Sequence, residues 1–352
     1  MRLLFIILLV AIPAAGQSAN LSKRPVNTYS IVAYDPKTGQ LGVAVQSHWF
    51  CVGCMVSWAQ AGVGAVATQS FIDPSYGALG LDMMRAGRSA PDALRGLLEA
   101  DGDRDVRQVG MVDAQGRAAA WTGAHNIQAA GHKVGGIVRL ASSASSDHGN
   151  FSAGRNYSVQ ANLMANHKVW PAMARAFEDA KGDLAERMLT ALEAAQTVGG
   201  DSRGTQSAAL IVVRGKTTGK QWTDRVFDLR VDDDPHPLRT LRRLVTLVRA
   251  YQHMNAGDLA VERNDNETAL HEYSMAGKLI AGQHDIPPDR RAEILYWHAV
   301  ALVNMGRVTR SLPLFRRAFA LHQSWRGITR CLSKAGLLSD NRRIIHRIEA
   351  IE

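Results

Sequence analysis

The segment that decides the fold is Thr-Tyr-Ser-Ile-Val-Ala-Tyr-Asp (28–35), followed by the turn Pro-Lys-Thr-Gly (36–39) and by Gln-Leu-Gly-Val-Ala-Val-Gln-Ser (40–47). Two apolar runs of strand length around a proline–glycine turn predict a β-hairpin. Thr28 stands at the head of the first strand. A threonine hydroxyl becomes a good nucleophile when a base takes its proton, and the α-amine of the same residue is such a base when threonine begins the chain. The function therefore depends on whether Thr28 becomes an N-terminus.

The start of the sequence is typical of a secretory signal. A positive charge at Arg2 precedes an apolar run over residues 3–15, which ends in the small residues Ala-Ala-Gly. A run of about 13 residues is too short to span a bilayer comfortably. We therefore expect residues 1–19 to be a signal peptide, cleaved after Gly16 or Ala19, with an uncleaved anchor as the alternative. The mature protein is then expected to be periplasmic or secreted, without a transmembrane segment.

The cysteines fit an exported protein, in which disulfides can form. Cys51 and Cys54 have CxxC spacing, but the βαβ context of a redox motif and the second half of a zinc site are both absent. We expect a local disulfide or plain packing for this pair, with redox chemistry and metal binding as alternatives, and a free Cys331. The histidines show no metal-ligand spacing such as HExxH. No metal and no cofactor is therefore predicted.

The formal net charge of +9 does not indicate a nucleic-acid partner. Much of the excess lies after Arg239, in pairs such as Arg242-Arg243 and Arg316-Arg317, which helical spacing scatters over a solvated surface. These pairs lack the interleaved aromatic side chains of a base-stacking platform. Weak attraction to anionic envelope polymers or lipid headgroups is the remaining electrostatic expectation.

The sequence pattern changes near residues 232–237, which predicts two domains, one over residues 28–234 and one over residues 238–352. The first mixes strands, glycines and helices, whereas the second is helical throughout. Further strands are expected at 62–70, 106–112, 117–122, 207–214 and 225–231, and helices at 76–86, 90–100, 169–180 and 184–197. Hairpins followed by paired helices favour an α+β fold, with antiparallel sheets and helices packed outside them.

The helical domain carries a weak internal repeat. Gly257, Ala269, Tyr273 and Ala276 hold the small and aromatic positions of a helix-turn-helix unit, and Ala299, Gly306, Phe315 and Ala318 repeat this layout about 42 residues later. The segment resembles a short tetratricopeptide array, whose unit has about 34 residues, with a longer loop at 281–289. Two repeats are too few to stand alone and should lean on the first domain. A partner protein is expected to bind here, and a generic helical hairpin domain is the alternative.

Polar side chains gather where the predicted elements of the first domain begin or end. Ser47, Thr68 and Gln69 lie at strand ends, and Gln160 and Asn162 are expected to open a helix. The loop Gly-Gly-Asp-Ser-Arg-Gly-Thr-Gln-Ser (199–207) adds an acid, a base, an amide and hydroxyls ahead of a strand. Its glycines allow positive φ and expose backbone N–H groups to anions. Residues 136–155 are expected to form an exposed insertion.

The stretch from Thr28 to about Asp234 resembles the uncharacterised DUF1028 family, which is assigned to the Ntn-hydrolase superfamily. The matching stretches are Thr-Tyr-Ser-Ile-Val-Ala-Tyr-Asp-Pro (28–36), Ala-Gly-Val-Gly-Ala-Val-Ala-Thr-Gln (61–69), Pro-Ser-Tyr-Gly (74–77), Ser-Val-Gln-Ala-Asn (158–162) and Gly-Gly-Asp-Ser-Arg-Gly-Thr-Gln-Ser-Ala-Ala (199–209). Each stretch is weak alone, but together they are specific. The resemblance implies a four-layer αββα sandwich, which agrees with the order of strands and helices expected above.

The resemblance also implies hydrolysis of a small amide or peptide-like substrate, with Thr28 as nucleophile, its freed amine as base and backbone N–H groups as oxyanion hole. Asp201 and Ser207 would tune that amine, and Arg203 would hold a substrate carboxylate. The expected substrate-binding set comprises Ser47, Thr68, Gln69, Gln160, Asn162, Arg203 and Gln206. Because superfamily members often assemble, a homo-oligomer is a further expectation.

This mechanism requires a second cut, between Asn27 and Thr28. The lysine that proteasome-type members keep beside the threonine has no obvious counterpart, since Lys37 sits in the turn. The alternative is a non-catalytic envelope protein, in which the first domain binds a ligand and the helical repeats bind a partner. Thr28 would then be an ordinary β-branched residue at the start of a strand.

Overall fold

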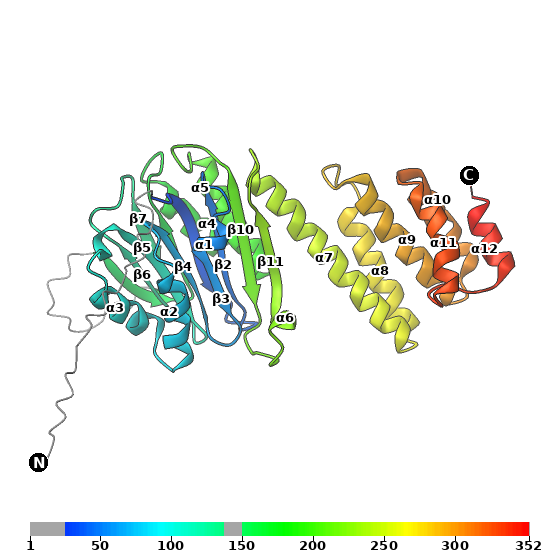
Figure 1. Ribbon diagram of the computed structural model, residues 1–352, viewed down its shortest axis with the longest axis horizontal. Coiled ribbons are helices and arrows are strands. Elements are labelled where there is room, and N and C mark those ends of the chain that lie inside the picture. Colours follow the sequence, from blue (N-terminus) through cyan, green and yellow to red (C-terminus); the bar gives the residue numbers. More distant parts are fainter. Residues whose placement is uncertain (1–24, 137–149, 352) are drawn as a thin grey trace, which may run out of the picture.

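The computed structural model describes residues 25–136 and 150–351 (Figure 1). The predicted signal peptide and residues 137–149 of the predicted insertion lie outside this part of the chain. The predicted hairpin is formed by β1 (Thr28–Tyr34) and β2 (Leu41–Ser47), which pair antiparallel. Its turn ends at Gly39, whose φ of +73° is a conformation that glycine adopts without the steric cost of a Cβ atom.

The strands form two antiparallel sheets. The six-stranded sheet has the order β11 (Arg225–Val231), β10 (Ser207–Val213), β2, β1, β9 (Tyr157–Ala161) and β7 (Gly131–Val134). The five-stranded sheet has the order β3 (Ser57–Gln60), β4 (Gly64–Ser70), β5 (Arg107–Asp113), β6 (Arg117–Thr122) and β8 (Phe151–Arg155). Three short helical turns lie in the connections: α1 (Gly53–Val56) between β2 and β3, η1 (Arg104–Val106) before β5, and α6 (Gln221–Asp224) between β10 and β11.

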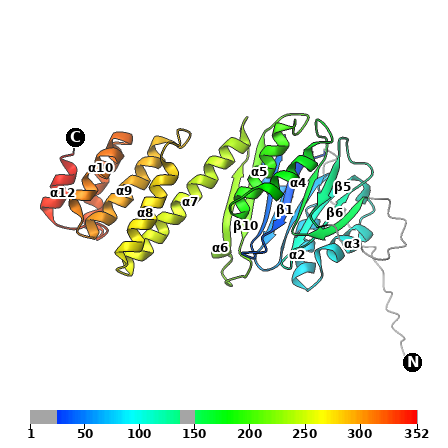
Figure 2. The same ribbon diagram turned by 180° about the vertical axis from the view of Figure 1, so that it is seen from behind.

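The two sheets face each other, and helices cover both outer faces (Figures 1 and 2). α4 (Val169–Asp179) and α5 (Leu184–Thr197) pack on the six-stranded sheet, and α2 (Ser75–Arg85) and α3 (Ala90–Ala100) pack on the five-stranded sheet. Strand β1 places apolar side chains on both faces of its sheet. Tyr29 and Ile31 belong to the core under α4 and α5, whereas Val32 belongs to the core between the sheets.

Residues 157–161 form strand β9, so the prediction that Gln160 and Asn162 open a helix was wrong. Strand β9 lies between β1 and the edge strand β7, and Asn162 follows it directly. The stretch does alternate with a period of two, but its polar residues Ser158 and Gln160 face the other sheet while Val159 joins the core under the helices. Because the usual rule places apolar residues inside, this inverted pattern concealed a buried strand.

The predicted insertion at 136–155 is also corrected in its last part. Residues 151–155 are strand β8 and pair with β6 at the edge of the five-stranded sheet. Strands β3 and β7 were not predicted. Each has only four residues, which is too few for a periodic pattern to stand out.

The C-terminal region is helical, and its first helix packs against the first domain. α7 (Pro237–Glu262) contacts β10, β11 and α5. Arg242 donates to Glu186 at 2.8 Å and to Glu193 at 2.6 Å, and Arg249 donates to Glu186 at 3.0 Å. The later helices extend away from the sheets (Figure 1). They are α8 (Asn266–Ile280), α9 (Pro288–Asn304), α10 (Val308–Leu321), α11 (Ser324–Lys334) and α12 (Arg342–Glu349).

All but one of the repeat positions of the sequence lie at the helix–helix contacts. α7 packs on α8, and α9 packs on α10. Tyr273 and Phe315, the aromatic members of the two units, are buried, as are Gly257 and the alanines of the repeat. Gly306 instead is exposed in the turn after α9, where its φ is +75°. Gly257 faces the ring of Tyr273 so closely that an added Cβ would lie 3.1 Å from it. Across the described residues, no helix combines the length and the apolar character needed to cross a membrane.

Candidate active site

Three hydroxyl side chains form a row across one end of the six-stranded sheet. Thr28 lies opposite Ser47, and Ser47 lies opposite Ser207. Directly opposed residues of antiparallel strands project to the same face. The row faces the second sheet, because Ser30, two residues after Thr28, bonds to Gln69 of that sheet. All three hydroxyl residues are fully buried.

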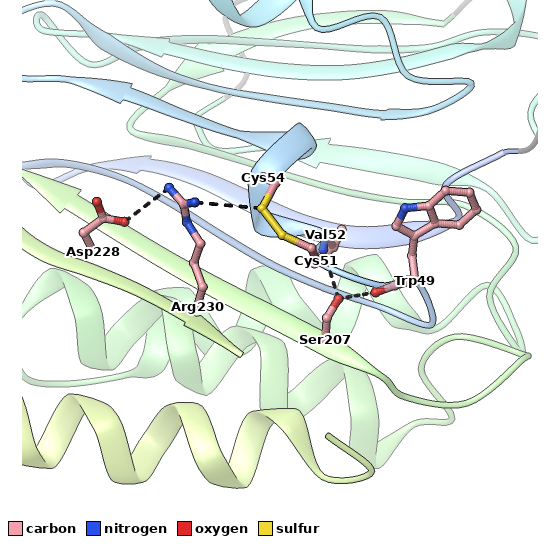
Figure 3. The surroundings of a disulfide bond; sticks show 7 residues. All are labelled: Trp49, Cys51, Val52, Cys54, Ser207, Asp228 and Arg230. Carbon is pink, nitrogen blue, oxygen red and sulfur yellow. Dashed lines mark hydrogen bonds and ion pairs between the residues drawn. A yellow bond between two sulfur atoms is a disulfide. The ribbon is translucent and has the colours of Figure 1, made fainter. Parts of the chain in front are cut away.

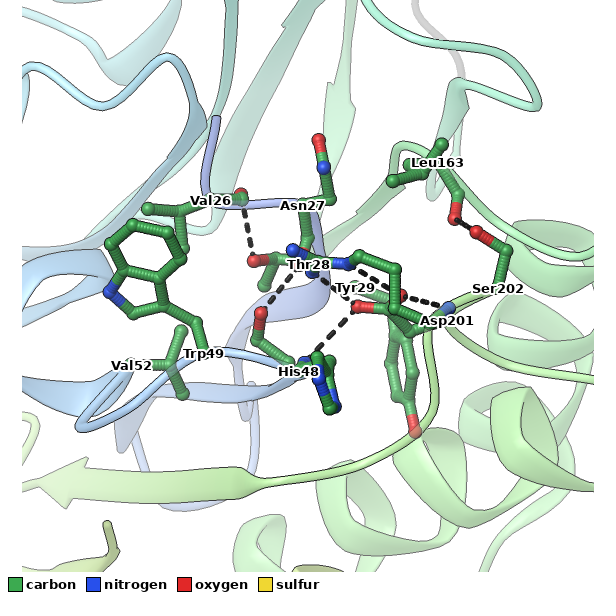
Figure 4. Close-up of polar contacts among 12 residues, drawn as sticks. Val26, Asn27, Thr28, Tyr29, His48, Trp49, Val52, Leu163, Asp201 and Ser202 are labelled. Carbon is green, nitrogen blue, oxygen red and sulfur yellow. Dashed lines mark hydrogen bonds and ion pairs between the residues drawn. The ribbon is translucent and has the colours of Figure 1, made fainter. Parts of the chain in front are cut away.

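Thr28 is enclosed by the residues that precede it (Figure 4). Its Oγ donates to the carbonyl oxygen of Val26 at 2.9 Å. Val26 in turn forms a two-way backbone bridge with Ser70, at 2.7 and 3.1 Å. Both Val26 and Asn27 are buried. The segment before Thr28 is therefore built into the sandwich and covers the hydroxyl.

The carbonyl oxygen of Asn27 is the acceptor at the centre of the site. It receives a hydrogen bond from Nη2 of Arg203 at 2.7 Å and one from Oγ of Ser47. This oxygen belongs to the peptide bond that joins Asn27 to Thr28. Donors aimed at a carbonyl oxygen stabilise the negative charge that nucleophilic attack on its carbon would place there. The arrangement can therefore polarise the bond whose cleavage would free the Thr28 amine.

Asp201 fixes the position of Arg203. Its buried carboxylate accepts from Nε of Arg203 at 3.0 Å and from Nη2 at 2.7 Å, which is a bidentate pair. It also accepts from the backbone N–H of His48 at 3.1 Å. Burial raises the pKa of the Tyr29 hydroxyl, and the negative charge of Asp201 raises it further. Asp201 thus acts on the site through Arg203 and the end of β2, and in the described part of the chain it forms no hydrogen bond with Thr28.

Gln69 and Asn162 hold the other side of Thr28. The Thr28 carbonyl oxygen accepts from Nε2 of Gln69 at 3.1 Å and from the backbone N–H of Asn162 at 3.1 Å. Both side chains also bond to Gln108, which was not predicted, at 2.7 and 2.8 Å. These contacts tie the start of β1 to β4 and β5 of the five-stranded sheet.

The amides belong to a larger polar network inside the sandwich. Ser30 joins Gln69 to Gln160, with bonds of 2.6 and 2.7 Å. Gln160 lies against Gly110 of β5, where an added Cβ would meet its Oε1 at 2.4 Å, so only glycine leaves room for the amide. Three residues predicted to bind substrate belong to this network: Gln69, Gln160 and Asn162. Gln69 and Gln160 share Ser30 as a hydrogen-bond partner, and Gln69 and Asn162 share Gln108. All three side chains are buried.

The network ends at His132 on β7. Gln108 donates to Thr122 at 2.9 Å, and Thr122 bonds to Nδ1 of His132 at 2.8 Å. The other ring nitrogen bonds to Ser152 at 2.9 Å. Burial lowers the pKa of His132 to about 4, so the imidazole is neutral at pH 7.

The Ser207 side chain is hydrogen-bonded to the backbone of the neighbouring disulfide loop (Figure 3). Its Oγ donates to the Trp49 carbonyl and accepts from the Val52 N–H at 3.1 Å. Within this loop, Cys51 and Cys54 form a disulfide with a Cα–Cα separation of 5.6 Å. Ser207 therefore shapes the loop that follows β2, and neither of these two hydrogen bonds involves Thr28 or Asp201.

The remaining predicted residues lie near the site and face away from Thr28. Thr68 donates to the Asp73 carbonyl at 3.2 Å. Gln206 bonds through its backbone to Ser47 and through its side chain to Asp233 at 3.1 Å. In the described ranges, the one group of side chains close enough to share a metal is Cys51, Cys54 and Asp232, and the disulfide occupies both of its sulfur atoms.

Sequence reasoning named the Asn27–Thr28 bond but missed the Asn27 carbonyl as an acceptor, and it missed Gln108 and His132 as members of the site. Asn27 takes part through its main-chain carbonyl oxygen, which every residue has, so the residue type at this position could not indicate the role. Gln108 interrupts an apolar strand, and an isolated buried amide in such a run does signal an internal hydrogen-bond partner. His132 lies on a strand too short to be recognised.

Comparison with known proteins identifies the family. The DUF1028 family, described as a family of unknown function, matches residues 28–144 and 138–241. The crystal structure of a DUF1028 protein from Silicibacter pomeroyi has a similar fold, with a TM-score of 0.51 and 27% sequence identity over 62% of this chain and 84% of that one. No curated protein matches. The resemblance seen in the sequence is thus confirmed at the level of the family, and the chain belongs to DUF1028.

Proposed function

We propose that this protein is an exported amide-bond hydrolase of the N-terminal-nucleophile type, whose Thr28 becomes active when the Asn27–Thr28 peptide bond is cut. The observation that carries the proposal is the pair of donors on the Asn27 carbonyl, Arg203 at 2.7 Å and Ser47. The two facing sheets with helices outside them support assignment to the αββα sandwich of this superfamily.

The cut is proposed to be made by the chain itself. Oγ of Thr28 attacks the Asn27 carbonyl carbon, and an Oγ–C bond forms. The C–N bond breaks, and the hydroxyl proton moves to the leaving nitrogen, which becomes the free amine. Water then hydrolyses the resulting ester, leaving an Asn27 carboxylate and restoring the Thr28 hydroxyl. Arg203 and Ser47 would stabilise the oxyanion in both steps.

The same groups would then act on a substrate. Once Val26 and Asn27 leave, the acyl group of a small amide or peptide-like substrate can take the place of the Asn27 carbonyl. The freed α-amine would accept the proton from Oγ, and Arg203 and Ser47 would again bind the oxygen that becomes negative. Asp201 would keep Arg203 in position by its bidentate pair. Arg203 is thereby assigned to the oxyanion in addition to the substrate carboxylate expected from the sequence.

Intact-mass analysis of the purified full chain tests this proposal. The expected product is a chain that begins at Thr28 and accumulates during incubation. A Thr28→Ser variant keeps a hydroxyl and should still be cut, whereas Thr28→Val keeps the shape of the side chain and should stay intact. An uncut wild-type chain, or equal cutting of the Val variant, would refute self-cleavage.

A second candidate function has a specific observation in its favour. In the intact chain Thr28 is fully buried, and among the described residues its hydroxyl forms a hydrogen bond with Val26 alone. A chain that is never cut would therefore keep the Thr28 hydroxyl inaccessible to a substrate. It would act as a ligand-binding or scaffold protein, with the helical repeats as the module that binds a partner.

A further inference from the structure

A pocket of about 560 Å³ lies between α8, α9 and α10, far from Thr28 along the chain. Three cationic side chains line it: Lys278 of α8, Arg291 of α9 and Arg317 of α10. No aspartate or glutamate is among its lining residues. Its volume is typical of cavities that hold small molecules. The pocket is thus large enough for a ligand and has one sign of charge.

The three cations have no anionic partner within the described part of the chain. Among the described residues none of them forms a salt bridge, and Nε of Arg291 is buried without a hydrogen-bond acceptor. Three acids of α8 and α9 have other partners: Glu272 pairs with His253, Glu293 accepts from Tyr251, and Asp289 pairs with Arg290. A half-buried guanidinium without a counter-charge is costly, and a bound anion would remove that cost.

The rest of the lining is apolar or aromatic. Ile280, Leu295, Leu314 and Leu321 contribute aliphatic surface. The rings of Tyr273 and His298 stack at 5.1 Å along one side. Burial, with a smaller contribution from Arg310, lowers the pKa of His298 to about 4, so the ring is neutral at pH 7. The cations therefore stand beside a surface that favours hydrocarbon.

We propose that this pocket binds a small amphiphilic anion. Its carboxylate or phosphate head would pair with Arg291, Arg317 and Lys278, and its apolar part would lie against the leucines. Arginine and lysine are the side chains that bind such heads by charge-assisted hydrogen bonds. The inference is independent of the chemistry at Thr28, because none of its residues belongs to the first domain.

Calorimetric titration of the full chain tests this site, with octanoate as the probe and uncharged octanamide as its matched analogue. Octanoate should bind saturably at one site per chain, and octanamide should bind about tenfold more weakly because it cannot form charge-assisted pairs. Inorganic phosphate should compete with octanoate if the head group alone is recognised. Equal binding of octanoate and octanamide, or no saturable binding of octanoate, would overturn the proposal.

Two double variants, each removing two positive charges, locate the site. Arg317→Gln combined with Lys278→Gln should weaken octanoate binding by about tenfold, since two of the three cations are lost. Arg316→Gln and Arg290→Gln remove the same charges from neighbouring positions outside the pocket and should leave binding within about twofold. The four positions are exposed or partly exposed, so folding should be retained. An equal loss in the control pair would show attraction to general charge and exclude the pocket.

Discussion

Arg203 donates a hydrogen bond of 2.7 Å to the carbonyl oxygen of Asn27, the residue directly before the candidate nucleophile. The same nitrogen lies 2.7 Å from the buried carboxylate of Asp201. The acid fixes one side of the guanidinium, and the other side points at the peptide carbonyl. The positive charge is therefore already in place to stabilise an oxyanion on that carbonyl. Its effect can be measured by how fast the adjoining peptide bond is cut.

Arg203→Met should slow cleavage of the Asn27–Thr28 bond by about 100- to 1000-fold, the usual effect of losing one oxyanion donor. Ser47→Ala should slow it as well, without leaving an acid unpaired. The fraction of cut chain is followed by intact mass over time. Arg155→Met, at the exposed opposite end of the sandwich, is the matched control. Cleavage of Arg203→Met and Ser47→Ala at the wild-type rate would contradict the role assigned to these donors.

Gln108→Leu should lower the free energy of unfolding by about 2–4 kcal/mol, because it leaves the amides of Gln69 and Asn162 without their shared acceptor. Urea unfolding followed by circular dichroism measures the change. Gln115→Leu, in an exposed turn, should change stability by less than about 0.5 kcal/mol. A similar loss in both variants would mean that the internal network is not what stabilises the sandwich.

Stability should fall as the pH drops below about 6.5 because of His132. Burial lowers its pKa in the folded protein to about 4, so the unfolded chain binds the proton more tightly between pH 6.5 and 4. The contribution of His132 to the free energy of unfolding is present above pH 6.5 and is progressively lost toward pH 4. The slope is at most about 1.4 kcal/mol per pH unit. His298 behaves in the same way.

The comparison of His132→Gln with wild type isolates that contribution. The variant should show a shallower decline of the unfolding free energy between pH 6.5 and 4, and His298→Gln provides a parallel measurement for the helical region. An unchanged pH profile in both variants would show that neither imidazole stays neutral on folding.

Thiol labelling of the native, unreduced protein should modify one cysteine per chain, the exposed Cys331. Cys51 and Cys54 should react only after reduction, because they are joined in a disulfide. Mass spectrometry of the labelled peptides gives the positions. Replacing both loop cysteines by serine should cost about 2 kcal/mol, since the closed loop is short. Labelling of Cys51 or Cys54 without reductant would contradict the bond.

The secondary structure was predictable where the hydrophobic pattern was strong. The β1–β2 hairpin and helices α3 and α5 were found close to their observed bounds, because apolar periodicity and turn residues coincide there. Strand β9 was missed for a physical reason. Its polar residues face inward, into a hydrogen-bond network that no local pattern reveals.

The sequence by itself determined the family, the hairpin that begins with Thr28 and the change to helices after residue 234. It also named Ser47, Asp201 and Arg203, which meet beside Thr28. Only the tertiary structure decided what they contact. Arg203 and Asn27 are 176 positions apart, and their bond exists because the strands that follow them, β10 and β1, both pair with β2. Local propensity cannot encode such a contact, since it depends on which strands become neighbours and in which register.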